Sequence, residues 1–212
     1  MKPNILPKVV FAQDYRSFEK DTVIEFPNRL TVISGDNGGG KSTLLSCIRV
    51  LFKSKWTLSH DHNAKGVLID TIKQTQEVAY IDISKDLCAT SPEIDFENIN
   101  LHIQAVKSSS GQGSMLQLHA LLTDCKCPLV ILDEPERGLA DCRQYMVRAL
   151  LQKFMAENPE TQVIITTHSK IFMDMADKLF EIQTRSLMSP SEYLARSKIM
   201  GKFYAEQIFP TQ

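Results

Sequence analysis

The fold is decided by one stretch of the chain, Gly35-Asp36-Asn37-Gly38-Gly39-Gly40-Lys41-Ser42-Thr43. A short apolar run with β-branched residues, Leu30-Thr31-Val32-Ile33, precedes it, and residues 44–52 follow with apolar side chains at helical spacing. A strand, a glycine-rich loop and a helix in this order form the context that a phosphate-binding P-loop requires. The sequence therefore predicts a site for a phosphorylated ligand at this loop.

The residue types explain how such a loop would hold phosphate. Glycines let the backbone curl so that successive N–H groups point at phosphate oxygens. A helix that begins near Lys41 adds the positive end of its dipole. The Lys41 ammonium is placed to reach the β- and γ-phosphates of a nucleotide, and the Ser42 hydroxyl is placed to bind Mg²⁺. We therefore expect ATP and Mg²⁺ as ligands.

Length and composition limit the class of protein. The 212 residues, 43% of them hydrophobic, suit one sizeable α/β domain, alone or with a small appendage. A net charge of −1 disfavours a protein that coats nucleic acid, although a local basic patch would be compatible with it. Residues 1–7 lack the apolar run of a signal peptide, and no stretch approaches the ~20 apolar residues of a membrane span. We expect a cytoplasmic protein with no membrane partner.

The five cysteines are odd in number and scattered, which is typical of reduced thiols in a cytoplasm. Two short motifs admit a metal-binding interpretation, Cys125-Lys126-Cys127 and His60-Asp61-His62. One residue is a poor spacer for a zinc site, and no second cysteine pair follows. Ordinary thiols before a buried strand and a solvated loop are the favoured interpretations.

Strand and helix patterns alternate along the chain. The continuous apolar run Leu129-Val130-Ile131-Leu132 is typical of a central parallel strand that is covered on both faces. The alternation predicts an α/β fold with a largely parallel sheet. The expected strands are 9–12, 22–26, 30–33, 77–83, 101–106, 129–132 and 162–167, the expected helices are 44–52, 114–123, 141–156, 171–180 and 191–207, and 53–65 is expected to be loop.

Asp133-Glu134-Pro135-Glu136 follows the predicted strand at 129–132. A carboxylate at the tip of a buried strand can be held rigidly beside the P-loop, so we expect Asp133 to bind Mg²⁺ directly or through water. Glu134 lies one step further out, where a carboxylate can orient and polarise an attacking water. The alternative is a charged turn after a core strand, which the presence of a P-loop disfavours.

Two further segments carry polar chemistry. The loop Ser108-Ser109-Ser110-Gly111-Gln112-Gly113 precedes the predicted helix at 114–123, and such a loop at a helix N-terminus is a second anion site. A flexible linker is the alternative interpretation. Thr166-Thr167-His168-Ser169 ends a buried strand, where a neutral imidazole could hydrogen-bond a γ-phosphate. A core or capping histidine is the alternative there.

The order of these segments resembles that of ABC-type ATPases, and the details are similar to the SMC, RecF and OLD-like group. Tyr15-Arg16-Ser17-Phe18 resembles the group's opening FRSF segment, and the P-loop resembles its GxNGxGKST form. The stretch from Asp133 to Leu139 is similar to its DEPExGL motif, and Thr167-His168-Ser169 matches its THS. The resemblance covers most of residues 5–182 and is specific because four motifs occur in order.

The resemblance implies a P-loop NTPase with an ABC-type head, a mixed or parallel central sheet flanked by helices, and a small lobe that carries a signature helix. Ser42 and Asp133 would hold Mg²⁺, Glu134 would be the hydrolytic carboxylate, and His168 would be the γ-phosphate switch. Because the signature loop in this family completes the site of the opposite subunit, Ser109 and Gly111 would contact ATP across a head-to-tail homodimer. The residues that would bind the phosphates are Gly35, Asn37, Gly38, Gly39, Gly40, Lys41, Ser42 and Thr43.

The expected domains are a head over 1–185, which includes a reduced lobe over 53–123 that carries the signature loop, and a helical extension over 186–212. A coiled-coil arm of about 100 Å needs two helices of about 67 residues each, and the interval from Lys41 to Ser109 is too short to hold both. We therefore expect a compact head without such an arm. Ser108, Ser110 and Ala140 depart from the family pattern. No clear Q-loop glutamine is found, and Asp82 is a weak candidate for that place. Slow or partner-dependent turnover is the consequence that we expect.

Three functions fit these observations. The first is an ATP-dependent switch that drives a protein partner, such as a nuclease or effector, in DNA repair and maintenance or in defence against phage, with DNA as a further potential ligand. The second is the nucleotide-binding subunit of an ABC transporter, which the DEPE form, the lack of a clear Q-loop glutamine and the short lobe disfavour. The third is an assembly module that binds ATP with little hydrolysis, which the unusual signature loop suggests.

Overall fold

A largely parallel β-sheet positions the P-loop at the carboxyl ends of its strands. The computed structural model describes residues 5–54, 64, 66–69, 77–82, 118–119, 121–123 and 125–208. Within these residues the main sheet has seven strands in the order β4-β5-β6-β7-β3-β8-β9, all parallel to their neighbours except β9. The strands are β3 (Leu30–Ser34), β4 (Lys53–Ser54), β5 (Glu77–Asp82), β6 (Leu129–Asp133), β7 (Gln162–Thr166), β8 (Leu179–Glu181) and β9 (Ser186–Met188).

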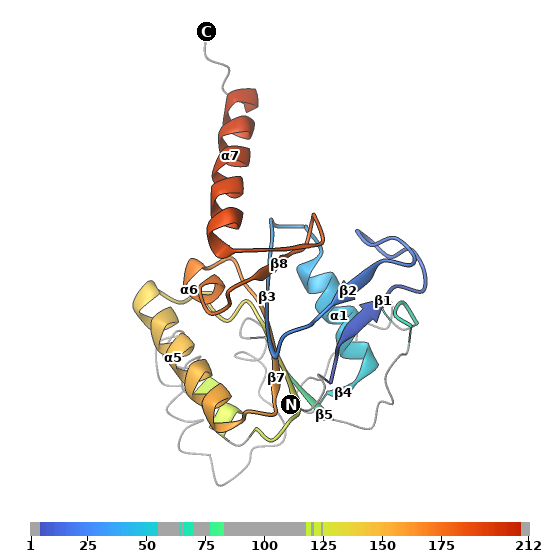
Figure 1. Ribbon diagram of the computed structural model, residues 1–212, viewed down its shortest axis with the longest axis vertical. Helices are drawn as coiled ribbons and strands as arrows, with labels where there is room; N and C mark the ends of the chain where they lie inside the picture. Colours follow the sequence, from blue (N-terminus) through green and yellow to red (C-terminus); the bar gives the residue numbers. More distant parts are fainter. Residues whose placement is uncertain are drawn as a thin grey trace.

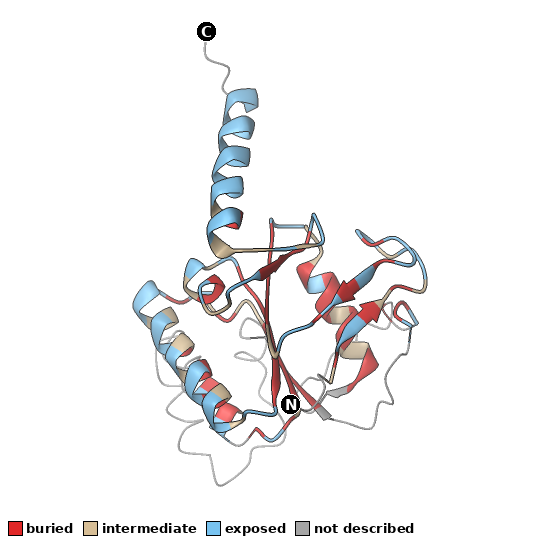
Figure 2. Cartoon of the chain, in the orientation of Figure 1, coloured by how far each residue is buried: buried red, intermediate tan, exposed pale blue. Residues whose placement is uncertain are grey.

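Both faces of the sheet are covered, because alternate residues of its strands enter different apolar clusters. Leu129 and Ile131 pack with α1 (Lys41–Leu51) on one face, together with the antiparallel pair β1 (Lys8–Val10) and β2 (Val23–Glu25). Val130 and Leu132 pack on the other face with α5 (Asp141–Glu157). Figure 1 shows α1 and α5 on opposite sides of the strands, and Figure 2 shows that the strands between them are buried.

The structure confirms most of the elements expected from the sequence within its described residues. The strands expected at 30–33, 77–83, 129–132 and 162–167 are present, and so are the helices expected at 44–52 and 141–156. The first two expected strands form a separate two-stranded sheet, β1 with β2. Residues 118–119 and 121–123 of the expected helix at 114–123 are helical, and the expected loop at 53–65 begins with β4. The expected strand at 101–106 and the whole signature loop lie outside the described residues.

The helix predicted over 171–180 is wrong beyond its first turn. Helix α6 spans only Lys170–Met173, and the chain then enters β8, where Leu179 and Phe180 pair with Val32 and Ile33 of β3. The spacing of apolar residues fits a helix locally, but pairing with a buried strand satisfies both the backbone and the side chains of this segment.

The last element, α7 (Pro190–Ile208), confirms the helix expected at 191–207. Its start has a capping box, because the Glu192 N–H donates to Ser189 Oγ at 3.2 Å and the Ser189 N–H donates to Glu192 Oε2 at 2.7 Å. Pro190 occupies the first helical position, where its missing N–H costs nothing. The helix projects from the body of the protein, as Figure 1 shows.

The predicted boundary between head and extension falls between β8 and β9. Because β9 pairs antiparallel with β8, residues 186–188 are part of the sheet, while the rest of the domain division stays a prediction. Among the described helices, none combines the length and the apolar character that crossing a membrane would require.

Candidate functional site

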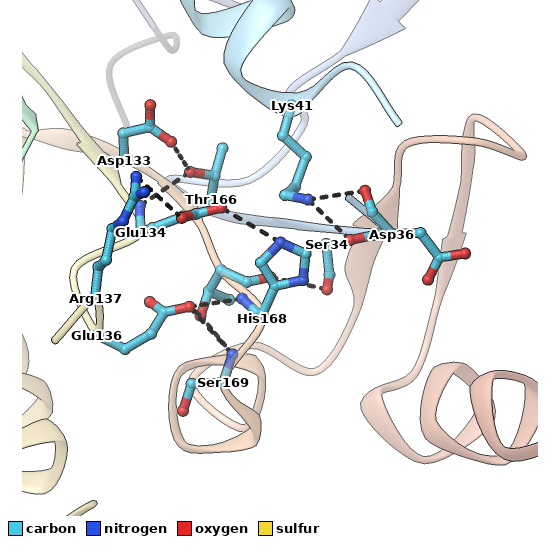
Figure 3. A network of polar contacts seen from close by, with 12 residues as sticks. Ser34, Asp36, Lys41, Asp133, Glu134, Glu136, Arg137, Thr166, His168 and Ser169 are labelled. Carbon is cyan, nitrogen blue, oxygen red and sulfur yellow. Dashed lines mark hydrogen bonds and ion pairs between the residues drawn. The ribbon is translucent and has the colours of Figure 1, made fainter. Parts of the chain in front are cut away.

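Strand register brings the predicted site residues to one end of the sheet. Asp133 at the end of β6 lies level with Thr166 of β7, and Thr166 lies level with Ile33 of β3. The P-loop begins two residues after Ile33, and His168 follows two residues after Thr166. Figure 3 shows the side chains of Lys41, Glu134 and His168 directed toward a common region. Segments that are distant in the sequence thus form one site.

The P-loop has the backbone that its glycines predict. Gly38 and Gly40 have φ values of 80° and 105°, in the left-handed region that favours glycine. A Cβ on Gly40 would lie 2.5 Å from Ser17 Oγ and 3.0 Å from the Phe18 ring, so the Tyr15–Phe18 segment closes tightly over the loop. Gly40 is also the N-cap of α1 and supplies no side chain to cap it. The first N–H groups of α1 therefore remain available for an anion.

Lys41 is buried at the start of α1, and its ammonium group contacts the loop. Its Nζ donates to the carbonyl oxygens of Gly35 at 2.8 Å and Asp36 at 3.2 Å. Burial lowers the pKa of Lys41 below its usual 10.5, although attraction to Glu134 and Asp133 opposes that shift. The cation is thus held among backbone acceptors and faces the carboxylates across the site.

Asp133 is fixed by two hydroxyl groups from the neighbouring strands. The Thr166 hydroxyl donates to its Oδ1 at 2.6 Å, and the Tyr80 hydroxyl donates to its Oδ2 at 3.1 Å. A hydroxyl donor orients a carboxylate without neutralising its charge. The side chain therefore has the fixed position and the negative charge that a magnesium ligand needs.

Glu134 begins the turn after β6 in an unusual backbone conformation. Its φ is 46°, which is uncommon for a residue with a side chain, and its N–H donates to the Thr166 carbonyl at 3.0 Å. Its Oε1 lies 3.3 Å from His168 Nε2, and its Oε2 lies 3.9 Å from Arg137 Nη1. The two residues predicted to act on the γ-phosphate are therefore in direct contact with each other.

Glu136 is a site residue that the sequence analysis did not single out. Its Oε1 accepts hydrogen bonds from the Thr167 hydroxyl at 2.8 Å, the His168 N–H at 2.6 Å and the Ser169 N–H at 3.2 Å. These contacts tie the turn after β6 to the segment after β7, as Figure 3 shows. The only signal in the sequence was its place in the Asp133–Glu136 motif, and that signal carried no geometry.

The segment at Arg16 is a second contribution to the site that became evident only in space. Arg16 Nη1 lies 3.4 Å from Thr43 Oγ1 in the first turn of α1, and Arg16 has a left-handed φ of 54°. The motif was noted in the sequence only as a family resemblance. The fold places it against the P-loop.

The donor set fits a magnesium nucleotide better than a metal bound by protein alone. Within the described residues, no group of three or more His, Cys, Asp or Glu side chains could hold a metal ion. Mg²⁺ usually binds through one or two carboxylates together with substrate phosphates. Asp133 would supply the carboxylate and the exposed Ser42 a hydroxyl, while the nucleotide would supply the phosphates. Cys125 and Cys127 are both buried. Ser109, Gly111 and His60-Asp61-His62 lie outside the described residues.

Comparison with known proteins agrees with this geometry. The family model AAA_23, described as an AAA domain, matches residues 12–183. An ABC transporter ATP-binding protein of Mycoplasma genitalium is 25% identical over 195 residues, which cover 76% of this chain and 53% of that protein. The chain thus spans about half the length of this relative.

Solved structures show the same fold. The SMC head domain from Thermotoga maritima matches with a TM-score of 0.51 and 18% identity over 82% of this chain and 93% of that one. CbiO1 from Clostridium perfringens, part of an ABC transporter complex, matches with a TM-score of 0.55 and 18% identity over 96% of each chain. An ATP-binding cassette of an ABC transporter in its ADP conformation matches with a TM-score of 0.58 and 17% identity over 97% of this chain and 100% of that one. These matches confirm the expected ABC-type P-loop fold.

Proposed function

This chain belongs to the AAA-domain family AAA_23, and from that premise we propose that it is an ATPase of the ABC type that switches between monomer and ATP-bound dimer. The observation that carries the proposal is the meeting of the P-loop with Asp133, Glu134 and His168 at one end of the sheet. A buried lysine, a helix start without a side-chain cap and a fixed carboxylate are the groups that a magnesium nucleotide requires.

The residues of the chain divide the work as follows. The P-loop backbone and Lys41 would hold the phosphates, while Ser42 and Asp133 would hold Mg²⁺, which would neutralise charge on the phosphates. Glu134, whose carboxylate faces the site beside His168, orients the attacking water and accepts its proton. His168, in contact with Glu134, reports whether a γ-phosphate is present. Ser109 and Gly111 of a second copy complete the site.

A glutamine variant of Glu134 tests the proposal. Glu134→Gln keeps the magnesium ligands but removes the group that accepts the proton from water, so ATP should be bound without turnover. With ATP and Mg²⁺, light scattering should give twice the monomer mass, while the Lys41→Ala control should stay monomeric and show no ATP binding by calorimetry. A Glu134→Gln protein that binds ATP but remains a monomer would rule out the sandwich.

The cellular role requires a separate proposal. We place the switch in DNA maintenance or phage defence by family analogy, with a nuclease or other effector as partner and a cytoplasmic location. The transporter alternative is supported by the name of the Mycoplasma relative. Purification of the protein with its bound partners distinguishes the two, because a membrane permease supports the transporter and a nuclease supports the first role. ATPase rates measured with and without DNA test the third alternative, an assembly module that binds ATP but hydrolyses little of it.

A further inference from the structure

Helix α7 extends past the end of the sheet at which the P-loop lies. Its first turns pack on the body, where Tyr193 joins a cluster with Val32 and Leu179. One turn later, Arg196 Nη1 lies 3.4 Å from Glu181 Oε2, and Glu181 pairs with Ser34, the last residue of β3 before the P-loop. The direction from Tyr193 to Arg196 therefore points toward the carboxyl ends of the strands. From Arg196 to its end at Ile208, the helix continues for about 18 Å at a rise of about 1.5 Å per residue.

The face of α7 that touches the body remains apolar where it leaves the body. Residues three, four and seven positions apart share one side of a helix, so Met200 continues the side of Tyr193, Phe203 continues the side of Arg196, and Tyr204 lies four positions beyond Met200. Met200, Phe203 and Tyr204 are exposed to 37%, 50% and 50%. Figure 2 shows this part of the helix exposed along its length. We call these three residues the arm stripe.

The base of α7 is connected to the P-loop by a chain of polar contacts. The Gln183 amide is assigned so that its nitrogen faces Glu181 and its oxygen faces the P-loop. In this orientation the amide nitrogen donates to the Glu181 carboxylate, which also contacts Arg196, and the amide oxygen accepts from the Asp36 N–H at 2.7 Å. The Gln183 side chain packs closely on Gly39, within 2.8 Å of the place where a Cβ would be. Helix α7 therefore has a fixed orientation relative to the P-loop.

We propose that the arm stripe docks on a second copy of this chain in the ATP-bound dimer, an inference that rests on the proposed function. The arm stripe extends the side of the helix that lies on the body, so it faces the space beyond the P-loop, which a second copy must enter to complete the site. All three side chains of the arm stripe remain exposed beside the described residues of the body. The partner in the sandwich is thus the molecule brought within their reach.

The size of the arm stripe indicates that docking depends on nucleotide. A stable interface needs about 800 Å² from each partner. A fully buried aromatic side chain contributes about 150–250 Å², so two half-exposed aromatic residues and a methionine supply well under half of that area. The arms alone therefore cannot hold a dimer, and they add to one that ATP and the head surfaces already form.

Measurement of the dimer dissociation constant tests this inference in the Glu134→Gln background with ATP and Mg²⁺. The test variant carries Met200→Ala, Phe203→Ala and Tyr204→Ala, and the matched control carries Lys198→Ala and Lys202→Ala on the opposite face of the same helix. Sedimentation equilibrium should show a dissociation constant raised about tenfold or more in the test variant, because truncation of buried aromatic anchors typically costs at least that much. The control should dimerise like its parent, and the monomers should bind ATP equally.

The possible failures can be told apart. A test variant that dimerises as tightly as its parent overturns the arm and leaves the sandwich intact. A Glu134→Gln parent that binds ATP without dimerising overturns the sandwich and the arm together. A dimer that forms without nucleotide and is lost in the test variant shows arms that pair alone, against the proposal. A benzoyl-phenylalanine at position 203 adds a readout independent of affinity: we expect an ATP-dependent crosslink between copies, and crosslinks only within one chain would contradict the docking.

Discussion

Removal of the Glu136 carboxylate should separate the two halves of the site. In Glu136→Ala the buried Thr167 hydroxyl loses a charged acceptor at 2.8 Å, a contact of a kind that contributes about 1.5–3 kcal/mol. The His168 N–H loses its 2.6 Å bond but can be hydrated, and the Ser169 N–H keeps the Thr167 hydroxyl at 2.9 Å. Among the described residues, none donates to the buried Glu136 Oε2, so its removal recovers about 1 kcal/mol of desolvation.

The net expectation is a free energy of unfolding lowered by about 1 kcal/mol, measured by urea unfolding followed by circular dichroism. Glu136→Gln is the matched control, since it keeps an oxygen acceptor and should lose about half as much. ATP turnover should fall in Glu136→Ala while ATP affinity is unchanged, because His168 loses its anchor and the P-loop does not. A Glu136→Ala protein within 0.5 kcal/mol of wild type would refute this reasoning.

Two further predictions concern the P-loop. Burial lowers the pKa of Lys41, so just below pH 10.5 the unfolded chain binds more protons than the folded protein. The free energy of unfolding of the wild type should therefore rise with pH in this range relative to that of Lys41→Met. Urea midpoints that change equally with pH in the two proteins would contradict this. Gly40→Ala should lower the free energy of unfolding by about 2 kcal/mol and weaken ATP binding in calorimetry, since φ is 105° and the new Cβ would meet Ser17. Gly201→Ala, with nothing near its Cβ in α7, is the control and should gain about 1 kcal/mol of helix stability; equal losses in both variants would argue against the strain.

Local patterns in the sequence were enough for the elements that build the site. The strand, glycine loop and helix around Lys41 are each specified by residues close in the chain, through β-branched side chains, glycine φ values and helical spacing. The buried strand before Asp133 was readable for the same reason, since its apolar run spans both faces of the sheet. The order of the motifs then indicated the family that the domain match confirms.

Contacts between distant residues decided the rest. The end of the helix expected over 171–180 is instead part of strand β8, because β3 offered it a pairing partner, and no window of local sequence contains that information. The contact of Glu134 with His168 and the bonds of Glu136 to the segment after β7 depend on the register of β6 against β7. The sequence indicated a helix at 191–207, but only packing of Tyr193 and Arg196 on the body fixed where its apolar side points. Sequence periodicity specifies which residues share a face, whereas tertiary packing determines what that face meets.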